Sequence, residues 1–385
     1  MRLKFQTRSI WNGSILEGII ICGDIPHGDR QVVEISDKKI VITGGAGFIG
    51  SHAAEYFAKL GWKVVAVDNL SRGKVLGETG MDTSVYNWNY LSVNGRIELV
   101  NASTIDDRKM EELIAEADAV VHTAGQVAVT TSLKDPRNDF ETNMLGTFNV
   151  LEACRKSGKS PSIVFCSTNK VYGENVNSID VEMSGNRYRY ADGRYEHGIP
   201  ESFPVDGCEH TPYGASKLSA DIYFQEYGHT YGLKTGVFRM SCIYGTRQFG
   251  NEDQGWIAHF LLSALRNREI TIYGDGRQVR DVLYVTDVIS AYDAFLKSNL
   301  RCGLFNMGGG PDNTISLLEL LDLIKELTGS KPRCRFDKWR NGDQKVYISD
   351  ISCAVQQLKW KPTVGIAKGL REMLDWAKGE RRIFQ

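Results

Sequence analysis

Short apolar runs alternate with longer mixed segments through the first two thirds of the chain. The runs IVITGG, VVAVDN, IELVN, AVVHTAG and IVFCST are rich in Val and Ile, as strands buried on both faces of a parallel sheet are. The segments between them are predicted helices, at about 48–61, 107–117, 139–157 and 213–228. Strands that alternate with helices at this spacing predict parallel βαβ units with right-handed crossovers.

The pattern changes beyond about Gly245, where helical segments at 256–267 and 316–329 stand among short strands and polar loops. We therefore expect an α/β protein whose residues 38–245 form a Rossmann-type doubly wound parallel sheet. Residues 246–385 are expected to form mainly a smaller, discontinuous C-terminal substrate-binding α/β domain, with 279–300 returning to the first domain. Residues 1–37 are expected to be a flexible N-terminal extension; a start codon placed too early or a transit peptide are the alternatives, and a signal peptide is a poor match.

Composition narrows the class of protein. The 385 residues carry 46 basic and 47 acidic side chains, a net charge of −1, so no large basic field predicts nucleic-acid binding. A run of about 18 apolar residues, which a membrane span needs, does not occur in the sequence. The eight cysteines form no C-x-x-C pair, which predicts reduced thiols in a cytoplasmic protein and no metal site.

A glycine-rich turn separates the first predicted strand from the first predicted helix. Gly44 suits the tight turn, Gly47 lets a pyrophosphate approach the backbone, and Gly50 allows close helix–strand packing. The following helix N-terminus offers N–H groups to phosphates.

Asp68 ends the second strand, where a carboxylate accepts hydrogen bonds from the adenine-side ribose and repels a 2′-phosphate. NAD is therefore favoured over NADP, although Arg72 leaves NADP as an alternative.

Candidate catalytic groups follow the fifth predicted strand. Tyr213 and Lys217 are four residues apart at the start of a predicted helix, so the phenol and the ammonium share one face. A nearby cation lowers the pKa of a phenol toward neutral pH, and the charge of a nicotinamide adds to that effect. Thr168 ends its strand at the sheet edge where open α/β sheets bind ligands, and its hydroxyl is expected to share the substrate oxygen with Tyr213.

These residues resemble the extended short-chain dehydrogenase/reductase superfamily, the NAD-dependent epimerase/dehydratase family, over about residues 38–380. The motifs that carry the resemblance are TGGAGFIGS, VVAVDNLSRG, VVHTAG, CSTNKVYG, YGASK, YGDGRQVRDVLYVTDV and FNMGGG. The resemblance implies a catalytic set of Thr168, Tyr213 and Lys217. The cofactor-binding positions that it implies are Gly44, Gly47, Phe48, Ile49, Gly50, Asp68, Asn69, Ser71, Arg72, Thr104, Ile105, Ala124, Gly125, Gln126, Tyr213 and Lys217.

A narrower resemblance concerns the substrate. STNKVYG, HTPYGASKLSADIYFQEYG, FRMSCIYGTRQFGNEDQGW and WRNGDQKVYISDI are similar to segments of epimerases that invert C2 of a CDP-linked hexose, CDP-paratose to CDP-tyvelose. That similarity implies a bound NAD⁺ that takes a hydride from C2 and returns it to the opposite face of a 2-keto sugar. The substrate positions that it implies are Thr168, Gln254, Tyr273, Arg280 and Arg340.

The chain departs from its relatives at two places. Many relatives carry Asp-Ile at the adenine, where this chain has Thr104-Ile105, so the adenine contact must differ. Many also carry Asn in the segment where this chain has Cys242, so the diphosphate must find another donor. Helices 139–157 and 213–228 resemble the pair through which relatives dimerise, which implies a homodimer or homotetramer.

Alternatives remain open at this stage. A 4,6-dehydratase uses Asp-Glu after the catalytic Thr, but here the pair is Asn169-Lys170, and neither side chain is a carboxylate. A UDP-hexose 4-epimerase uses the same Thr, Tyr and Lys chemistry with a different substrate pose. A reductase that consumes its cofactor often prefers NADP, against which Asp68 argues. A non-catalytic NAD(H)-sensing protein typically loses the Tyr or the Lys, and both are present.

Overall fold

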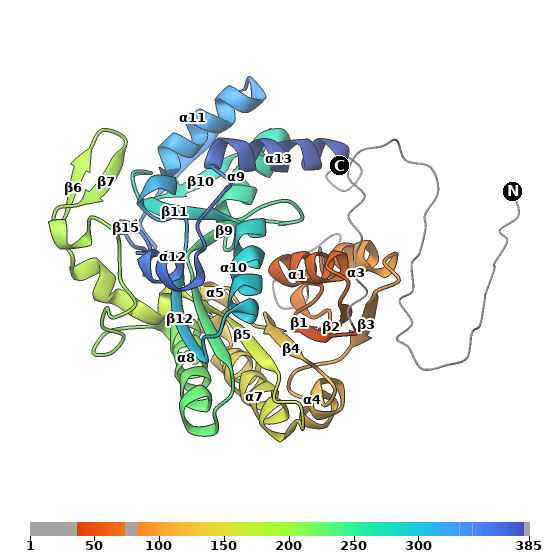
Figure 1. Cartoon of the computed structure of the whole chain (residues 1–385). Coiled ribbons are helices and arrows are strands. Elements are labelled where there is room, and N and C mark those ends of the chain that lie inside the picture. The colour runs from red at the N-terminus through yellow and green to blue at the C-terminus, as the bar shows by residue number, and fades with distance from the viewer. Residues whose placement is uncertain (1–36, 74–82, 331, 341, 381–385) are drawn as a thin grey trace, which may run out of the picture.

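The computed structural model of the 385-residue chain describes residues 37–73, 83–330, 332–340 and 342–380 (Figure 1). The predicted N-terminal extension, apart from Asp37, lies outside this part of the chain. Within it, no helix combines the length and the apolar character that crossing a bilayer requires.

A seven-stranded parallel sheet forms the larger part of the protein. Its order is β12-β8-β5-β4-β1-β2-β3. The strands are β1 (Lys39–Thr43), β2 (Lys63–Asp68), β3 (Ile97–Asn101), β4 (Ala119–His122), β5 (Ser162–Thr168), β8 (Thr235–Met240) and β12 (Cys302–Met307). The strand order reverses between β1 and β4, the place at which open α/β sheets bind ligands. The predicted Rossmann-type fold is confirmed.

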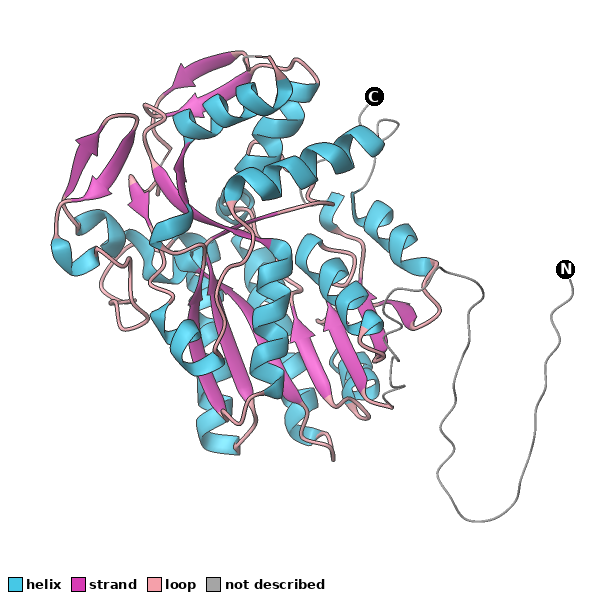
Figure 2. Cartoon of the chain, turned by 45° about the horizontal axis from the view of Figure 1, so that its top comes forward, coloured by secondary structure: helices cyan, strands magenta, loops and turns pink. Residues whose placement is uncertain are grey.

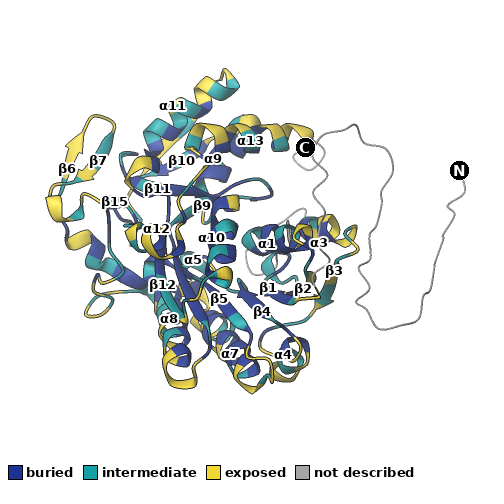
Figure 3. Ribbon diagram, in the orientation of Figure 1, coloured by how far each residue is buried: buried dark blue, intermediate teal, exposed yellow. Residues whose placement is uncertain are grey.

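Helices cover both faces of this sheet, because successive strand residues point to opposite sides. Ile40 and Ile42 of β1 pack with α1 (Phe48–Lys59), α3 (Thr83–Ser92), α10 (Val285–Lys297) and α12 (Ser352–Leu358). Val41, between them, packs with α4 (Asp107–Ile114), α7 (Gly146–Lys156) and α8 (Thr211–Tyr231). The strands are therefore buried from both sides (Figure 3).

The helix predicted at 139–157 is not regular. It consists of α6 (Pro136–Phe140), a π-helical turn at Glu141–Leu145 and α7. A π turn accommodates one extra residue and often marks a functional site. Here it carries Asn143, which is buried and turned toward the loop after β4.

A second group of elements lies above the carboxyl ends of the strands (Figures 1 and 2). It has its own apolar core, with residues from α9 (Trp256–Leu265), α11 (Leu317–Thr328), α13 (Ile366–Gly379) and β10 (Ile270–Tyr273). β10 pairs with β14 (Cys334–Asp337). The strand β11 (Val279–Tyr284) is central, because it pairs with β9 (Cys242–Tyr244), β13 (Thr314–Ser316) and β15 (Val346–Tyr347).

Residues 279–300, which are expected to return to the first domain, span β11 and α10. The expected return at 279–300 begins with β11, but that strand pairs with the second group and not with the large sheet. The return starts at α10, which contacts α1 and β5, and it continues through β12, the end strand beside β8. β11 lies between the two cores, because Val282 and Tyr284 pack in the second core whereas Leu283 packs with Ile40 and Ile42 in the core of the large sheet. The domain boundaries themselves stay a prediction.

An insert follows β5. It comprises a helical segment at Asn169–Ser178, the short helix Gly193–Tyr195 and the hairpin of β6 (Val181–Ser184) and β7 (Arg187–Tyr190). Arg187 of the hairpin pairs with Glu319 of α11 at 2.5 Å, so the insert is fastened to the second group of elements.

Candidate active site

The glycine turn after β1 has no room for side chains. Gly44 has φ 70°, and a Cβ there would lie 2.7 Å from the backbone nitrogen of Ala124. A Cβ on Gly50 would lie 2.0 Å from the Gly44 carbonyl oxygen, so α1 touches the turn directly. Gly47 caps α1 without a side-chain hydrogen bond, which leaves the positive end of the helix facing the first pocket. This cradle fits a dinucleotide pyrophosphate.

The first pocket extends from that cradle along the ends of β2, β3 and β4. Asp68 lines it and also holds its wall, because its carboxylate accepts hydrogen bonds from the N–H groups of Ala46 at 3.0 Å and Leu70 at 2.8 Å. The predicted cofactor residues that line it are Gly44, Gly47, Asp68, Asn69, Ser71, Arg72, Thr104, Ile105, Ala124, Gly125 and Gln126.

Five predicted cofactor residues do not line this pocket: Tyr213 and Lys217, which lie in α8, and three residues of α1. Phe48, Ile49 and Gly50 form the first turn of α1, and the side chains of Phe48 and Ile49 pack into apolar clusters. The structure therefore leaves their backbone N–H groups, and not their side chains, as candidates for phosphate contacts.

The loop after β4 is held by the π turn. Asn143 accepts from the N–H of Gln126 at 2.9 Å and donates to its carbonyl at 3.0 Å. The Gln126 side chain donates to Asp139 at 2.8 Å, so it is turned away from the pocket. Asp139 also accepts from Ser216 at 2.5 Å, which ties the loop to α8. Asp139 was not anticipated from the sequence, where it reads as an ordinary helix-surface acid.

The candidate catalytic residues converge at the end of β5. Tyr213 stands in the first turn of α8, and its N–H, which has no partner within the helix, donates to Ser132 of α5 (Val129–Lys134) at 3.2 Å. Lys217, one turn on, donates to the Cys166 carbonyl of β5 at 2.6 Å and lies over the Phe165 ring at 4.1 Å. Thr168 is joined to Tyr213 by a side-chain hydrogen bond.

The electrostatics differ from the sequence-based expectation for Tyr213. Burial raises the pKa of Tyr213, and the hydrogen bond with Thr168 offsets only part of that rise. Burial also lowers the pKa of Lys217 to about 8. Protein groups alone therefore do not bring the phenol toward neutral pH, because desolvation outweighs the hydrogen bond with Thr168. The expected shift depends on the positive charge that a bound nicotinamide supplies.

The convergence point lies between two pockets. A Cβ on Gly125, which lines the first pocket, would be 3.9 Å from Lys217 Nζ. Residues of α5, whose Ser132 holds Tyr213, line the second pocket, together with residues of α9, β10 and β11. Thr168, Tyr213 and Lys217 are not themselves among the lining residues, but each pocket adjoins them through these neighbours.

The second pocket contains four of the predicted substrate residues, Gln254, Tyr273, Arg280 and Arg340. The Arg340 guanidinium lies 3.7 Å from the Tyr273 ring centroid and 3.4 Å from an Asp253 carboxylate oxygen. Gln254 also accepts from Arg72 of the first pocket at 3.2 Å. This contact joins the two pockets directly, and the sequence predicted each residue without predicting that they meet.

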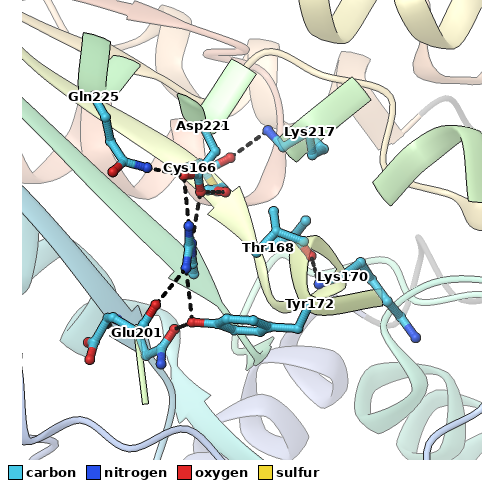
Figure 4. A network of polar contacts seen from close by, with 12 residues as sticks. Cys166, Thr168, Lys170, Tyr172, Glu201, Lys217, Asp221 and Gln225 are labelled. Carbon is cyan, nitrogen blue, oxygen red and sulfur yellow. Dashed lines mark hydrogen bonds and ion pairs between the residues drawn. The ribbon is translucent and has the colours of Figure 1, made fainter. Parts of the chain in front are cut away.

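A buried charged pair supports the strand that carries Thr168 (Figure 4). The Arg239 guanidinium of β8 and the Asp221 carboxylate of α8 are 3.0 Å apart, and Ser167 donates to Asp221 at 2.7 Å. Arg239 also donates to the hydroxyl of Tyr172 at 3.1 Å. Sequence reasoning missed this network, because its members come from three distant segments and each resembles a surface residue when taken alone.

The glycine cradle, the acidic strand end and the Thr, Tyr and Lys side chains between two pockets define a dinucleotide-dependent enzyme. The model of the NAD dependent epimerase/dehydratase family matches residues 40–308, and the chain belongs to that family. The predictions of an enzyme of this kind and of NAD as its cofactor are confirmed.

Named relatives refine this class. The chain is 39% identical over 347 residues to CDP-paratose 2-epimerase of Salmonella typhi, covering 88% of this chain and 98% of the relative. A solved UDP-glucose 4-epimerase of Thermotoga maritima with UDP-glucose is 31% identical, with a TM-score of 0.72 over 89% of this chain and 99% of that one. A UDP-glucuronic acid 4-epimerase of Bacillus cereus, solved with its substrate and NAD, is 27% identical with a TM-score of 0.73, at the same coverage.

Proposed function

We propose that the protein is a nucleotide-sugar epimerase that inverts C2 of a CDP-linked hexose. The observation that carries this proposal is the 39% identity with CDP-paratose 2-epimerase over 98% of that relative. The candidate site supports it, since Thr168, Tyr213 and Lys217 stand between a dinucleotide pocket and a second pocket that holds two arginines.

In this mechanism NAD⁺ would be held by the glycine turn and Asp68 of the first pocket and would supply reversible hydride transfer at C2. Tyr213 removes the proton of the C2 hydroxyl, Thr168 hydrogen-bonds that oxygen, and Lys217 holds the positive charge that favours phenolate. The sugar becomes a 2-ketone, turns over within the second pocket, and receives the hydride on its opposite face while Tyr213 returns the proton. Hydride and proton both leave and both return, so no external reductant is consumed.

Tyr213→Phe tests the base. Removing one general acid–base group costs about 10²- to 10⁴-fold in rate, so turnover should fall by about 1,000-fold while the purified variant keeps its NAD. Tyr231→Phe, at the exposed end of the same helix, is the matched control and should keep full activity. Activity is followed by NMR of the C2 and C4 configuration of CDP- and UDP-hexoses, without added nicotinamide. An active Tyr213→Phe enzyme would remove Tyr213 as the base.

A UDP-hexose 4-epimerase is the second candidate. The 31% identity with the Thermotoga maritima enzyme favours it, and the same catalytic groups serve both reactions. The NMR experiment separates the two: inversion at C4 of a UDP-hexose, with C2 of CDP-hexoses unchanged, would replace the first proposal with the second.

We also propose that two copies of the chain pair through the outer surface of α7 and α8. Phe148, Ile222 and Tyr223 are exposed there, at 36%, 51% and 42% of their surface. Large apolar side chains gathered on one face typically mark an interface. Light scattering should give the mass of a dimer or tetramer, and Ile222→Glu should lower it; a monomeric wild type would contradict this arrangement.

A further inference from the structure

Lys170 is the side chain that the catalytic set leaves unexplained. It follows Thr168 by two residues, and its backbone N–H donates to the Thr168 hydroxyl oxygen at 3.2 Å. Its side chain is directed away from the Asp221–Arg239 network (Figure 4) and lines the second pocket. It is thus a cation in the substrate region whose backbone is tied to a catalytic residue.

The ammonium of Lys170 uses only part of its hydrogen-bonding capacity within the described residues. Its Nζ donates to the Gly342 carbonyl at 3.1 Å, and the described residues offer it no further acceptor and no ion pair. A lysine ammonium carries three donors. Two of them therefore remain for a ligand in the pocket.

The guanidinium of Arg280 lines the same pocket and is close enough to influence the pKa of Lys170. The Arg280 cation and burial both lower the pKa of Lys170, with burial the larger cause, while Asp343 and Glu174 oppose them. Arg280 itself donates to the Val279 carbonyl at 2.8 Å and, among the described residues, makes no ion pair. Two neighbouring cations in one partly buried pocket repel each other, and an anion placed between them would relieve both.

Three other residues that line the second pocket provide few hydrogen-bond donors for an anion. The Cys242 thiol lines the pocket nearby, accepts from the indole N–H of Trp256 at 3.3 Å, and is a weak donor. Glu252 and Asp253, on another side of the pocket, are held by Arg340. Among the cations that line the pocket, Lys170 is the one whose backbone is bonded to Thr168, and Asp343 is the carboxylate of the lining that acts on it.

We propose that Lys170, together with Arg280, binds the diphosphate of the nucleotide sugar next to Thr168 and thereby selects C2 for reaction. This inference rests on the proposed function and deepens it. In a nucleotide sugar the diphosphate is attached at C1, the neighbour of C2, whereas C4 lies across the ring. A phosphate anchor this near the catalytic threonine brings C1 and C2 to Tyr213 and keeps C4 away. Lys170 is thus a positioning residue.

The test compares a nucleoside diphosphate with its nucleoside. Calorimetry should show that Lys170→Met binds CDP about 10- to 100-fold more weakly, the loss expected for a charged hydrogen bond, and cytidine within twofold of the wild type. Lys170→Arg should restore most of the CDP affinity. Lys368→Met, an exposed lysine of α13, controls for net charge. Bound NAD, measured in each variant, reports that the fold is intact.

Catalysis supplies a second measurement. The kcat/KM for C2 inversion by Lys170→Met should fall by at least the factor lost in CDP affinity. Unchanged CDP affinity with reduced turnover would overturn the proposal, and so would an equal loss for CDP and cytidine, which would indicate a collapsed pocket. A wild-type enzyme that prefers UDP to CDP, or that inverts C4, would contradict the proposed function instead. The role of Lys170 in binding phosphate would then be tested by comparing the affinities of the variants for UDP and for uridine.

Discussion

The two pockets, which are joined by the contact between Arg72 and Gln254, are built in different ways. The first is largely backbone: glycines at 44, 47 and 125, a helix end and one carboxylate, all at the edge of a single sheet. The second is built from charged and aromatic side chains of α5, α9, β10 and β11 and of the loop that holds Arg340. Backbone is positioned by the sheet itself, whereas each side chain in the second pocket depends on its own partners. We therefore expect the first pocket to be rigid and intolerant of change, and the second to tune specificity.

The largest expected effect tests that rigidity. Gly50→Ala places a carbon 2.0 Å from the Gly44 carbonyl oxygen, and neither backbone can move without disturbing β1 or α1. We expect a loss of about 3 kcal/mol in the free energy of unfolding, the upper range for overpacking, and a purified protein that no longer holds NAD. Absorbance of the cofactor released on denaturation and urea unfolding measure the two effects.

Gly95→Ala is the matched control for that variant. No atom lies within 4 Å of a Cβ at this position, so stability and bound NAD should stay at wild-type values. The affinity of Gly50→Ala for CDP, which is expected to bind in the second pocket, then measures how strongly a change in the first pocket affects the second. If Gly50→Ala retains NAD and stability, the backbone cradle is more compliant than its packing indicates, and the contrast between the pockets fails.

This difference also explains what could be predicted from the sequence. The glycine turn, Asp68 and the Tyr213–Lys217 pair are each contiguous or one helical turn apart, so local spacing fixes their geometry. The four predicted substrate residues lie together in the second pocket, but only the resemblance to relatives pointed to them. Lys170 was noticed merely as a residue that is not a carboxylate, and Asp221 and Arg239 were missed, since their pairing depends on how β5, β8 and α8 pack. The position of 279–284 between the two cores could not be predicted for the same reason: a buried strand has the same sequence pattern in either sheet.

A smaller effect concerns β4, whose last residue, His122, directly precedes Thr123 of the first pocket. His122 of β4 is fully buried, and its ring nitrogens are 2.7 Å from the Thr43 hydroxyl and 2.9 Å from the Thr147 hydroxyl. Burial lowers the pKa of His122 from 6.5 to about 3. The unfolded chain therefore takes up a proton below pH 6.5 that the folded protein refuses until about pH 3, and stability falls as the pH falls between these values.

For one such histidine the loss between pH 7 and pH 5 is about 2 kcal/mol. Burial lowers the pKa of His52, on α1, to about 3 as well, so the two add in the wild type. His122→Gln, although less stable at pH 7, should show about half the wild-type shift in urea midpoint between pH 7 and pH 5, and His52→Gln should do the same independently. If the His122→Gln shift equals that of the wild type, acid sensitivity arises elsewhere than at His122. The strand that supports the first pocket would then not be an acid-sensitive part of the protein.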